Sequence, residues 1–491
     1  MEAKVKTVDI RAGKPVVILN KREAGERSIF LGDRVCIKYE DREEMSIVDL
    51  SSGVPRGNVF LFDETTECLD VKEGDVVNIE PTIKPDSVDY IKKKIGGEEL
   101  SREETYSIVQ DAVKSRLTDP ELMAYTTAIQ MSEFSMKEAE HLTKAMVETG
   151  EEINIEGALD KHCIGGVPGN RTTPIVVSII AAAGYKIPKT SSRAITSPAG
   201  TADTMEVITN VKHGASEVES IVRKTNGCFT WGGSLNLAPA DDEFIRVRDS
   251  LNIDPLEQLL SSVLAKKKAV GAETVLIDIP MGEETKVTEH EEADKLSRYF
   301  KELGRKLDME VLTIISDGSQ PVGNGIGPAL EARDILEILE TGGKKGPVDL
   351  REKCIKMADI LLQKVGSEKG AEDILESGEA YEKFKDITKV QGARTTSSED
   401  IELSKKKHVV KSDTRGRIKE IKNSAVNKIA KSTGCPKEKG SGIYLHKKVG
   451  DPVDEGDELL TIYSETDKRL QKAVELAEKN KVFVLKSLLS K

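Results

Sequence analysis

A glycine-rich stretch in the first half of the chain gathers residues that could bind an anion. Residues 160–174 read Asp-Lys-His-Cys-Ile-Gly-Gly-Val-Pro-Gly-Asn-Arg-Thr-Thr-Pro, and Lys161, His162 and Arg171 add positive or titratable charge. Free backbone N–H groups at the start of the following helix, together with its dipole, favour phosphate. The stretch lacks the Gly-Lys-Ser/Thr ending of a P-loop and the Gly-x-Gly-x-x-Gly fingerprint. On its own it therefore fits a tight turn as well as a phosphate site.

A second polar stretch, at residues 188–204, carries hydroxyl groups around one arginine. It reads Pro-Lys-Thr-Ser-Ser-Arg-Ala-Ile-Thr-Ser-Pro-Ala-Gly-Thr-Ala-Asp-Thr. Small hydroxyl residues with Arg193, after a predicted strand and before a helix that begins at Gly200-Thr201, are typical of a phosphate or ribose site. An ordinary loop rich in serine and threonine is the alternative. Two such loops within one strand–helix–strand repeat favour binding.

Composition excludes several classes of protein. The net charge of −12 and the aromatic content of 4% argue against a nucleic acid or an anionic membrane as the main partner. No apolar run reaches the ~18 residues of a membrane span, and the N-terminal residues show no signal-peptide core, so we expect a cytoplasmic protein. The cysteines and histidines are scattered, without Cys-x-x-Cys or His-Glu-x-x-His, so we expect neither a metal site nor a disulfide framework.

The elements that must position these loops begin with a strand-rich segment. A chain of 491 residues is too long for one core, so three or four domains are expected. Residues 1–84 predict short strands at 16–19, 28–31, 35–39, 59–62 and 76–79. This segment resembles the small double-psi barrel found ahead of certain ATPases, and we interpret it as an accessory or assembly module.

Helical signals follow, and then an alternation of strands and helices. Capping boxes at Ser101 and Ser135, with a helix start at Asp119, predict a helical unit. From 151 to about 400, the pattern is that of an α/β domain, with strands predicted at 158–164, 186–190, 274–279 and 310–315 and helices at 174–183, 287–304, 327–340 and 350–365. Two consecutive helices, 240–251 and 255–269, would rejoin the helical unit and leave a cleft, a common place for ligands.

The last segment predicts a small α+β domain after a polar linker at 393–405. The stretch that begins at Lys448 resembles the turn of a biotinyl-type barrel, but no Met-Lys-Met site accompanies it. The predicted fold class is therefore a multidomain α/β protein with four parts: an N-terminal β-barrel (1–84), a helical lobe (86–155 and 235–270), an α/β phosphate-binding lobe (156–234 and 271–395) and a C-terminal α+β barrel-like domain (405–491).

Several motifs resemble the thymidine/pyrimidine-nucleoside phosphorylase family. They begin at Asp160 (Asp-Lys-His-Cys-Ile-Gly-Gly-Val), Ser191 (Ser-Ser-Arg-Ala-Ile-Thr), Gly200 (Gly-Thr-Ala-Asp-Thr-Met-Glu), Gln320 (Gln-Pro-Val-Gly) and Ile326 (Ile-Gly-Pro-Ala-Leu-Glu). The N-terminal barrel, which ordinary pyrimidine phosphorylases lack, and the wording Gly-Gly-Val-Pro-Gly-Asn-Arg are similar to the archaeal AMP phosphorylase branch. That branch implies the reaction of AMP with phosphate to give adenine and ribose 1,5-bisphosphate, with CMP and UMP as additional substrates, in nucleotide salvage or catabolism. It implies a homodimer or larger homo-oligomer, and no metal or cofactor beyond the co-substrate phosphate.

The resemblance also implies individual roles. Lys161, Cys163, Thr172, Ser191 and Thr201 fall where the pyrimidine enzymes hold phosphate, with Cys163 in place of the usual serine. His162 matches the histidine near the base, and Arg248, Ser262 and Lys266 align with the residues that hold the pyrimidine, although the Arg248–Ser262 segment is one residue shorter here. The AMP branch implies a set of nucleotide contacts: Gly166, Ser192, Arg193, Ala194, Ile195, Thr196, Ser197, Thr201, Ser262 and Lys286.

Phosphorolysis needs a general acid for the leaving base, and the resemblance implies Asp254 for this role. Asp254 would have to stay protonated through burial or a nearby anion. From spacing alone, a helix N-cap before Pro255 is the better interpretation. His162 is the other candidate acid because of its ordinary pKa. Lys286 would bind the 5′-phosphate, which a nucleoside lacks.

Three other functions fit parts of the pattern. A pyrimidine-nucleoside phosphorylase would release base from nucleosides and nucleotides alike. A relative of anthranilate phosphoribosyltransferase would need Mg²⁺ for a pyrophosphate substrate, so activity that EDTA does not affect would exclude it. A non-catalytic assembly or adaptor protein would release no base in the presence of phosphate.

Overall fold

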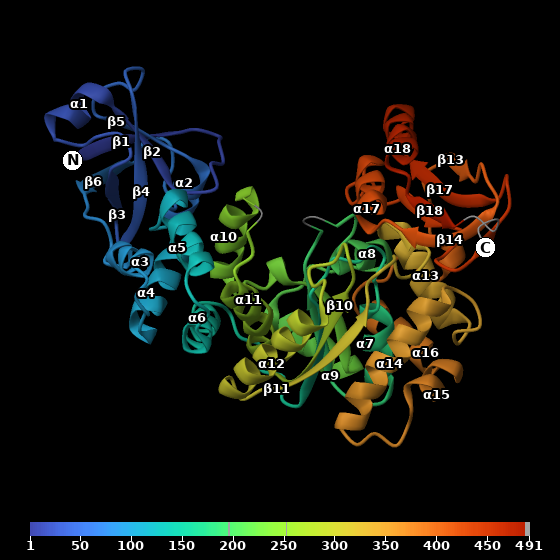
Figure 1. Ribbon diagram of the computed structural model, residues 1–491. Helices are drawn as coiled ribbons and strands as arrows, with labels where there is room; N and C mark the ends of the chain where they lie inside the picture. The colour runs from blue at the N-terminus through green and yellow to red at the C-terminus, as the bar shows by residue number, and fades with distance from the viewer. Residues whose placement is uncertain (195–196, 252, 487–491) are drawn as a thin grey trace. The chain divides into compact units, whose positions relative to one another are not determined.

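The computed structural model describes residues 1–194, 197–251 and 253–486, and the chain forms two compact units. The first unit comprises residues 1–149 and 239–261, and the second comprises 150–238 and the chain from Ser262 onward. Figure 1 labels most of the helices and strands named below. No helix in the described ranges combines the length and the apolar character that a membrane crossing requires.

A closed β-barrel opens the first unit and confirms the predicted N-terminal barrel (Figure 1, blue). Its strands, in spatial order, are β1 (Glu2–Thr7), β5 (Asn58–Leu61), β2 (Val16–Asn20), β4 (Arg42–Ser51), β3 (Arg34–Tyr39) and β6 (Val76–Pro81). Alternate residues point inward, so Val5, Leu19 and Val35 are completely buried. Two short helices, α1 (Lys21–Glu26) and α2 (Asp63–Leu69), were not predicted from the sequence.

The strand predicted at residues 28–31 is wrong. Ser28 has a φ of +55°, which ends any extended backbone at that point. The Phe30 N–H donates to the Asp33 carboxylate at 2.7 Å and closes a turn. Phe30 and Leu31 are exposed in this turn, so their apolar character does not reflect pairing in a sheet.

Helices from two chain segments complete the first unit. The first segment contributes α3 (Ser87–Ile95), α4 (Arg102–Val113), α5 (Asp119–Met131) and α6 (Met136–Glu148). Ser101 and Glu104 form the predicted capping box at the start of α4. The second segment contributes α10 (Pro239–Arg248) and the first turns of α11 (Leu256–Ala269). The Phe244 ring of α10 lies 5.6 Å from the Tyr125 ring of α5, so the later segment packs on the earlier helices. The helix predicted over 240–251 ends at Arg248 and continues as a 3₁₀ turn.

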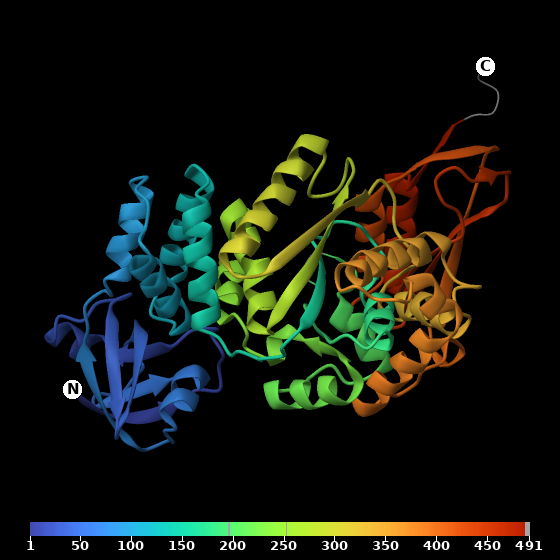
Figure 2. The same ribbon diagram turned by 90° about the horizontal axis from the view of Figure 1, so that it is seen from below.

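Parallel strands form the centre of the second unit. β7 (Ala158–Cys163) pairs with β10 (Ala272–Met281), and β10 pairs with β11 (Glu310–Asp317). Figure 2 shows the long strands β10 and β11 side by side. β8 (Ile187–Ser191) pairs with β9 (Gly227–Trp231), and the Leu159 N–H bonds to the Lys186 carbonyl at 2.8 Å, so β8 lies beside β7. The two polar loops therefore follow the ends of neighbouring strands, where α/β folds bind ligands.

Helices cover these strands. They are α7 (Thr173–Ala182), α8 (Thr201–Ile208), α9 (Ala215–Thr225), α12 (His290–Lys306), α13 (Pro328–Glu340), α14 (Val348–Lys364), α15 (Ala371–Glu376) and α16 (Glu379–Val390). α7 is the most deeply buried, because nearly every residue from Thr173 to Ala181 is inaccessible to solvent. Its continuous apolar sequence follows from this position rather than from amphipathic packing.

The C-terminal part is the predicted α+β domain. Its elements are β13 (Lys406–Lys411), β14 (Gly416–Ile421), α17 (Asn423–Ser432), β15 (Gly442–Leu445), β16 (Pro452–Val453), β17 (Glu458–Ser464), α18 (Asp467–Asn480) and β18 (Phe483–Lys486). One sheet includes a strand from the α/β part, because β12 (Gly325–Ile326) pairs with β15. Lys448 Nζ donates to the Pro321 carbonyl at 2.8 Å and to Asp349 at 2.9 Å. The loop before α13 is therefore held by the C-terminal domain.

Candidate active site

A buried ion cluster is centred on Asp160, in the middle of β7. One oxygen of Asp160 accepts a hydrogen bond from Lys189 Nζ at 2.8 Å, and the other lies 2.8 Å from Lys267 Nζ. Burial disfavours the Asp160 carboxylate, but the two amino groups outweigh this effect and lower its pKa. Burial also lowers the pKa of Lys267, which Asp160 counteracts. Since one carboxylate faces two amino groups, an additional anion nearby would interact favourably with this cluster.

Lys161 supplies a third buried amino group. Its side chain is only 1% exposed, and Nζ donates to the hydroxyl of Thr172. Burial lowers the pKa of Lys161, an effect that Cys163 and Asp278 oppose. Thr172 precedes the first turn of α7 but makes no capping bond with its side chain. An ammonium group, a hydroxyl and the N–H groups of a helix start therefore lie together, as phosphate binding requires.

The glycines of the first loop are needed for close approach as well as for the turn. Gly165 and Gly166 have φ of +89° and +102°. A Cβ on Gly166 would lie 3.3 Å from the backbone of both Thr285 and Lys286. A Cβ on Gly169, whose φ is +67°, would lie 2.4 Å from the Val322 carbonyl oxygen. The structure thus brings together two of the predicted nucleotide contacts, Gly166 and the exposed Lys286.

The pKa shifts of His162 and Cys163 both favour the neutral side chain. Burial, reinforced by Lys267 and Lys189, lowers the pKa of His162 well below its usual value. Burial raises the pKa of Cys163 to about 12, and Asn170 Nδ2 lies 3.2 Å from its sulfur. A neutral thiol does not repel a bound anion. It is, however, a weaker hydrogen-bond donor than the serine hydroxyl expected at this position from the pyrimidine-nucleoside phosphorylases.

Arg193 is engaged within the protein. Its guanidinium donates to both oxygens of Glu206, at 2.7 and 2.6 Å, and to Asp203 at 3.2 Å. It also lies over the Trp231 ring, 4.9 Å from the centroid. These pairs raise the pKa of Arg193, Glu206 contributing most. The side chain therefore fixes the second loop instead of presenting a free cation to a ligand.

The other predicted contacts of the second loop lie along its backbone. Ser192 is exposed, and Ser191 and Ser197 donate to the carbonyls of Thr230 (3.4 Å) and Ala199 (2.9 Å). The Ala194 N–H donates to Asp203 at 2.7 Å. Two further predicted contacts lie outside the described residues: Ile195 and Thr196.

The residues predicted to contact the base belong to both units. In the first unit, Arg248 Nη1 lies 3.2 Å from Asp254 Oδ1, and the Asp254 side chain is 33% exposed. In the second unit, Ser262 and Lys266 are four residues apart on α11 and so share one side of that helix. The adjacent Lys267 is the residue that reaches Asp160.

One polar network near the loop was not identified from the sequence. Asp278, at the end of β10, pairs with Lys353 Nζ at 2.9 Å and accepts a hydrogen bond from Ser316 at 2.5 Å. The Asn170 side chain of the glycine loop lies 3.4 Å from the same carboxylate. The available signal was a single aspartate within the apolar run from Val275 to Met281, since such a residue needs a buried partner.

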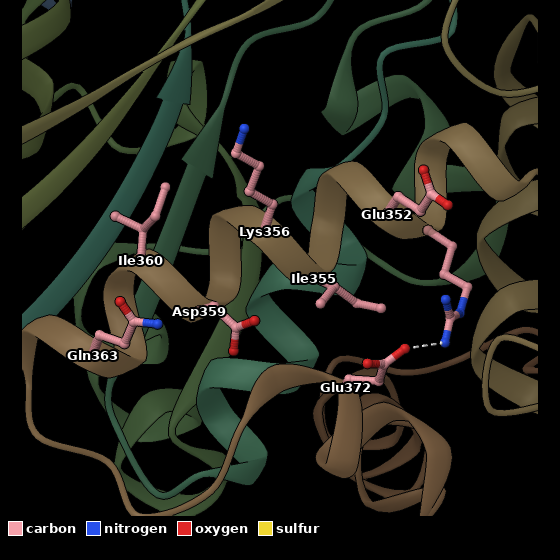
Figure 3. Close-up of a pocket in the computed structure, with 8 residues that line it drawn as sticks. Glu352, Ile355, Lys356, Asp359, Ile360, Gln363 and Glu372 are labelled. Atoms are coloured by element: carbon pink, nitrogen blue, oxygen red, sulfur yellow. Dashed lines mark hydrogen bonds and ion pairs between the residues drawn. The ribbon is translucent and has the colours of Figure 1, made fainter.

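A surface hollow of about 480 Å³ lies elsewhere, along α14 and beside Glu372 of α15 (Figure 3). Carboxylates, cations and isoleucines alternate around it, and Glu372 pairs with Arg351 at 2.7 Å. The hollow shares no residue with the two loops, so we assign it no role in the chemistry. Within the described ranges, no group of three or more His, Cys, Asp or Glu residues could hold a metal ion.

Three family models match the chain. A helical bundle domain of a glycosyl transferase family matches residues 88–150, and the a/b domain of such a family matches 156–330. The C-terminal domain of pyrimidine nucleoside phosphorylases matches residues 417–483.

Curated relatives align over almost their full length. AMP phosphorylase 1 of Archaeoglobus fulgidus is 42% identical over 98% of this chain and 97% of that protein. The AMP phosphorylase of Methanocaldococcus jannaschii is 44% identical over 96% and 95%, and that of Pyrococcus horikoshii 45% identical over 98% and 97%. Among solved structures, anthranilate phosphoribosyltransferase from Thermus thermophilus matches with a TM-score of 0.51 at 19% identity, covering 62% of this chain and 99% of that one. This last likeness shows a shared fold only.

Proposed function

Since the chain belongs to the AMP phosphorylase family, we propose that it converts AMP and phosphate into adenine and ribose 1,5-bisphosphate. The observation that carries this proposal is the identity of 42% to AMP phosphorylase 1 over 98% of the chain, the N-terminal barrel included. CMP and UMP are proposed as additional substrates. We also propose that the enzyme is cytoplasmic and acts as a homodimer or larger homo-oligomer.

The arrangement around β7 supports a role in binding inorganic phosphate. Lys161, Thr172 and the first turn of α7 offer an ammonium, a hydroxyl and backbone N–H groups in one place. A phosphate oxygen held there would attack C1′ of the ribose while the bond to the base breaks and its electron pair leaves with the base. The negative charge of the bound phosphate stabilises the developing positive charge on the ribose ring.

We propose Asp254 as the group that protonates the leaving base. The low pKa of His162 leaves its imidazole neutral near pH 7, so it is poorly suited to donate a proton as an imidazolium. In the structure Asp254 is paired with Arg248 and its side chain is 33% exposed, so this role requires that nucleotide binding separates the pair and leaves the carboxyl group protonated. Ser262 and Lys266 would hold the base in this proposal.

Replacing Lys286 with alanine should raise KM for AMP about ten- to a hundred-fold and leave kcat nearly unchanged. The proposed partner of Lys286 is the 5′-phosphate, and loss of one charge-assisted hydrogen bond costs about 1.5–3 kcal/mol. Initial rates across a range of AMP concentrations measure the effect. The exposed Lys295→Ala on α12 is the matched control. An unchanged KM for Lys286→Ala would remove this lysine from the 5′-phosphate site.

The proposed function is tested by phosphate-dependent release of base from AMP, CMP, UMP and the corresponding nucleosides. We expect adenine from AMP and much less from adenosine. Equal rates from AMP and adenosine would exclude a specific AMP phosphorylase. Light scattering of the purified protein determines the number of subunits.

A further inference from the structure

Arg171 joins the two polar loops, and the reaction described above leaves it without a role. Its Nη1 donates to the Thr201 hydroxyl at 3.1 Å, and Nη2 donates to the Ala199 carbonyl at 2.7 Å. Its Nε donates to Glu331 on α13 at 2.7 Å. One guanidinium therefore connects the glycine loop, the end of the hydroxyl-rich loop and a helix more than a hundred residues later.

The contact with Glu331 fixes the orientation of this guanidinium. The Glu331 side chain is 1% exposed and that of Arg171 is 14% exposed, so the ion pair is almost sealed from water. The same Glu331 oxygen accepts a hydrogen bond from Thr204 at 2.8 Å. A planar guanidinium whose three donors are engaged on two other segments cannot rotate without breaking several hydrogen bonds at once.

The Thr201 hydroxyl can still donate its hydrogen to a ligand. Its oxygen accepts from Arg171, and within the described residues no acceptor for its own hydrogen occurs. The Thr172 hydroxyl likewise accepts a hydrogen bond from Lys161, so its own hydrogen can be donated to a ligand. A hydroxyl that accepts a hydrogen bond from a cation can offer its hydrogen to a ligand, and an ionised phosphate oxygen is a pure acceptor. The site thus carries two hydroxyls that are each oriented by a cation, the buried Lys161 and the largely buried Arg171.

We propose that Arg171 is a positioning residue, which holds Thr201 beside the glycine loop and directs its hydroxyl toward an anionic phosphoryl oxygen. The ligand chemistry is that of a phosphate group, which either inorganic phosphate or the 5′-phosphate of AMP can supply. This inference rests on the proposed function, because it assigns a residue to the same site.

A double-mutant cycle tests the proposal. Arg171→Met/Glu331→Gln removes the cation together with its buried carboxylate, so that no unpaired charge is left to disrupt the fold. Thr201→Val removes the hydroxyl at nearly constant volume. We expect each change to raise one KM about ten-fold with a smaller effect on kcat, because each one loses the same charge-assisted hydrogen bond. The combined variant should be no worse than either alone, since Arg171 acts through Thr201.

The source of the phosphoryl group is identified by which KM changes. The KM for phosphate is measured at saturating AMP and the KM for AMP at saturating phosphate. The control is Lys94→Met/Glu138→Gln, which removes a pair whose side chains are 5% and 13% exposed in the first unit. We expect it to lower the melting temperature without changing either KM. Effects that multiply in the combined variant, or a KM that stays at the wild-type value, would overturn the proposal.

A second measurement separates this inference from the proposed function. Inorganic phosphate or AMP should raise the melting temperature of the wild-type protein, because each binds the folded state. The rise with one of them should be lost in both Arg171→Met/Glu331→Gln and Thr201→Val. If the wild type releases no base from AMP but this loss is observed, the proposed function fails and the role of Arg171 stands. If base is released and both variants keep the full rise, the role of Arg171 fails alone.

Discussion

Asp254→Asn is expected to lower kcat at least a hundred-fold while KM for AMP changes little. A general acid contributes about 10²–10⁴-fold to a rate, and an amide of the same size has no proton to give to the departing base. An effect on kcat without an effect on KM would show that the interaction is made mainly in the transition state. Adenine release at saturating AMP and phosphate measures it directly.

The exposed Asp249→Asn, in the 3₁₀ turn that follows α10, is the control for a charge change in the same segment. It should retain the wild-type rate. If Asp254→Asn does so as well, water or His162 supplies the proton.

Because burial lowers the pKa of His162, its imidazole has lost its proton before neutral pH is reached. We therefore expect kcat to show no change around pH 6.5 that depends on His162.

Lys161→Met is expected to raise KM for phosphate about a hundred-fold. The change removes a buried ammonium at nearly constant volume, and losing one partner of a buried charge pair costs about 2–5 kcal/mol. KM for AMP should respond much less, which kinetics with each substrate varied in turn will show. Lys186→Met is the matched control, since this lysine is exposed and donates to the Glu156 carbonyl at 2.9 Å.

The affinity for phosphate should also depend on pH through Lys161. Burial lowers the pKa of this amino group, so it loses its proton at a lower pH than an exposed lysine does. Only the protonated form attracts an anion, and phosphate affinity should therefore fall as the solution becomes alkaline. Lys161→Met should lack this part of the dependence. An identical pH profile in the variant would assign the effect to another group.

Local features of the fold could be predicted from the sequence because they depend on neighbouring residues. The capping box of Ser101 and Glu104 and the strand that became β7 are of this kind. The error at residues 28–31 arose because a short apolar run such as Ile29-Phe30-Leu31 also occurs in turns. No local pattern distinguishes a left-handed Ser28 from an extended one.

The candidate site was less predictable, because its contacts join distant segments. The sequence showed that Lys161 and Arg193 lie in anion-binding patterns, but it could not show which of them is already neutralised. Arg193 is paired with Glu206 in the following helix, whereas Lys161 contacts a hydroxyl. The pairing of Asp160 with Lys267 depends on β7 and α11 meeting in the fold, and hydrophobic periodicity does not encode such a meeting.

The pairing of β12 with β15 bears on the order in which the enzyme is completed during synthesis. Val322, which packs against Gly169, lies three residues before β12, and β12 finds its strand partner only at Gly442–Leu445. Lys448, which holds the same loop, is translated later still. Every residue assigned to catalysis or binding leaves the ribosome before these supports do. A fragment that stops at the 393–405 linker would therefore carry the whole set of site residues and still be expected to lack activity.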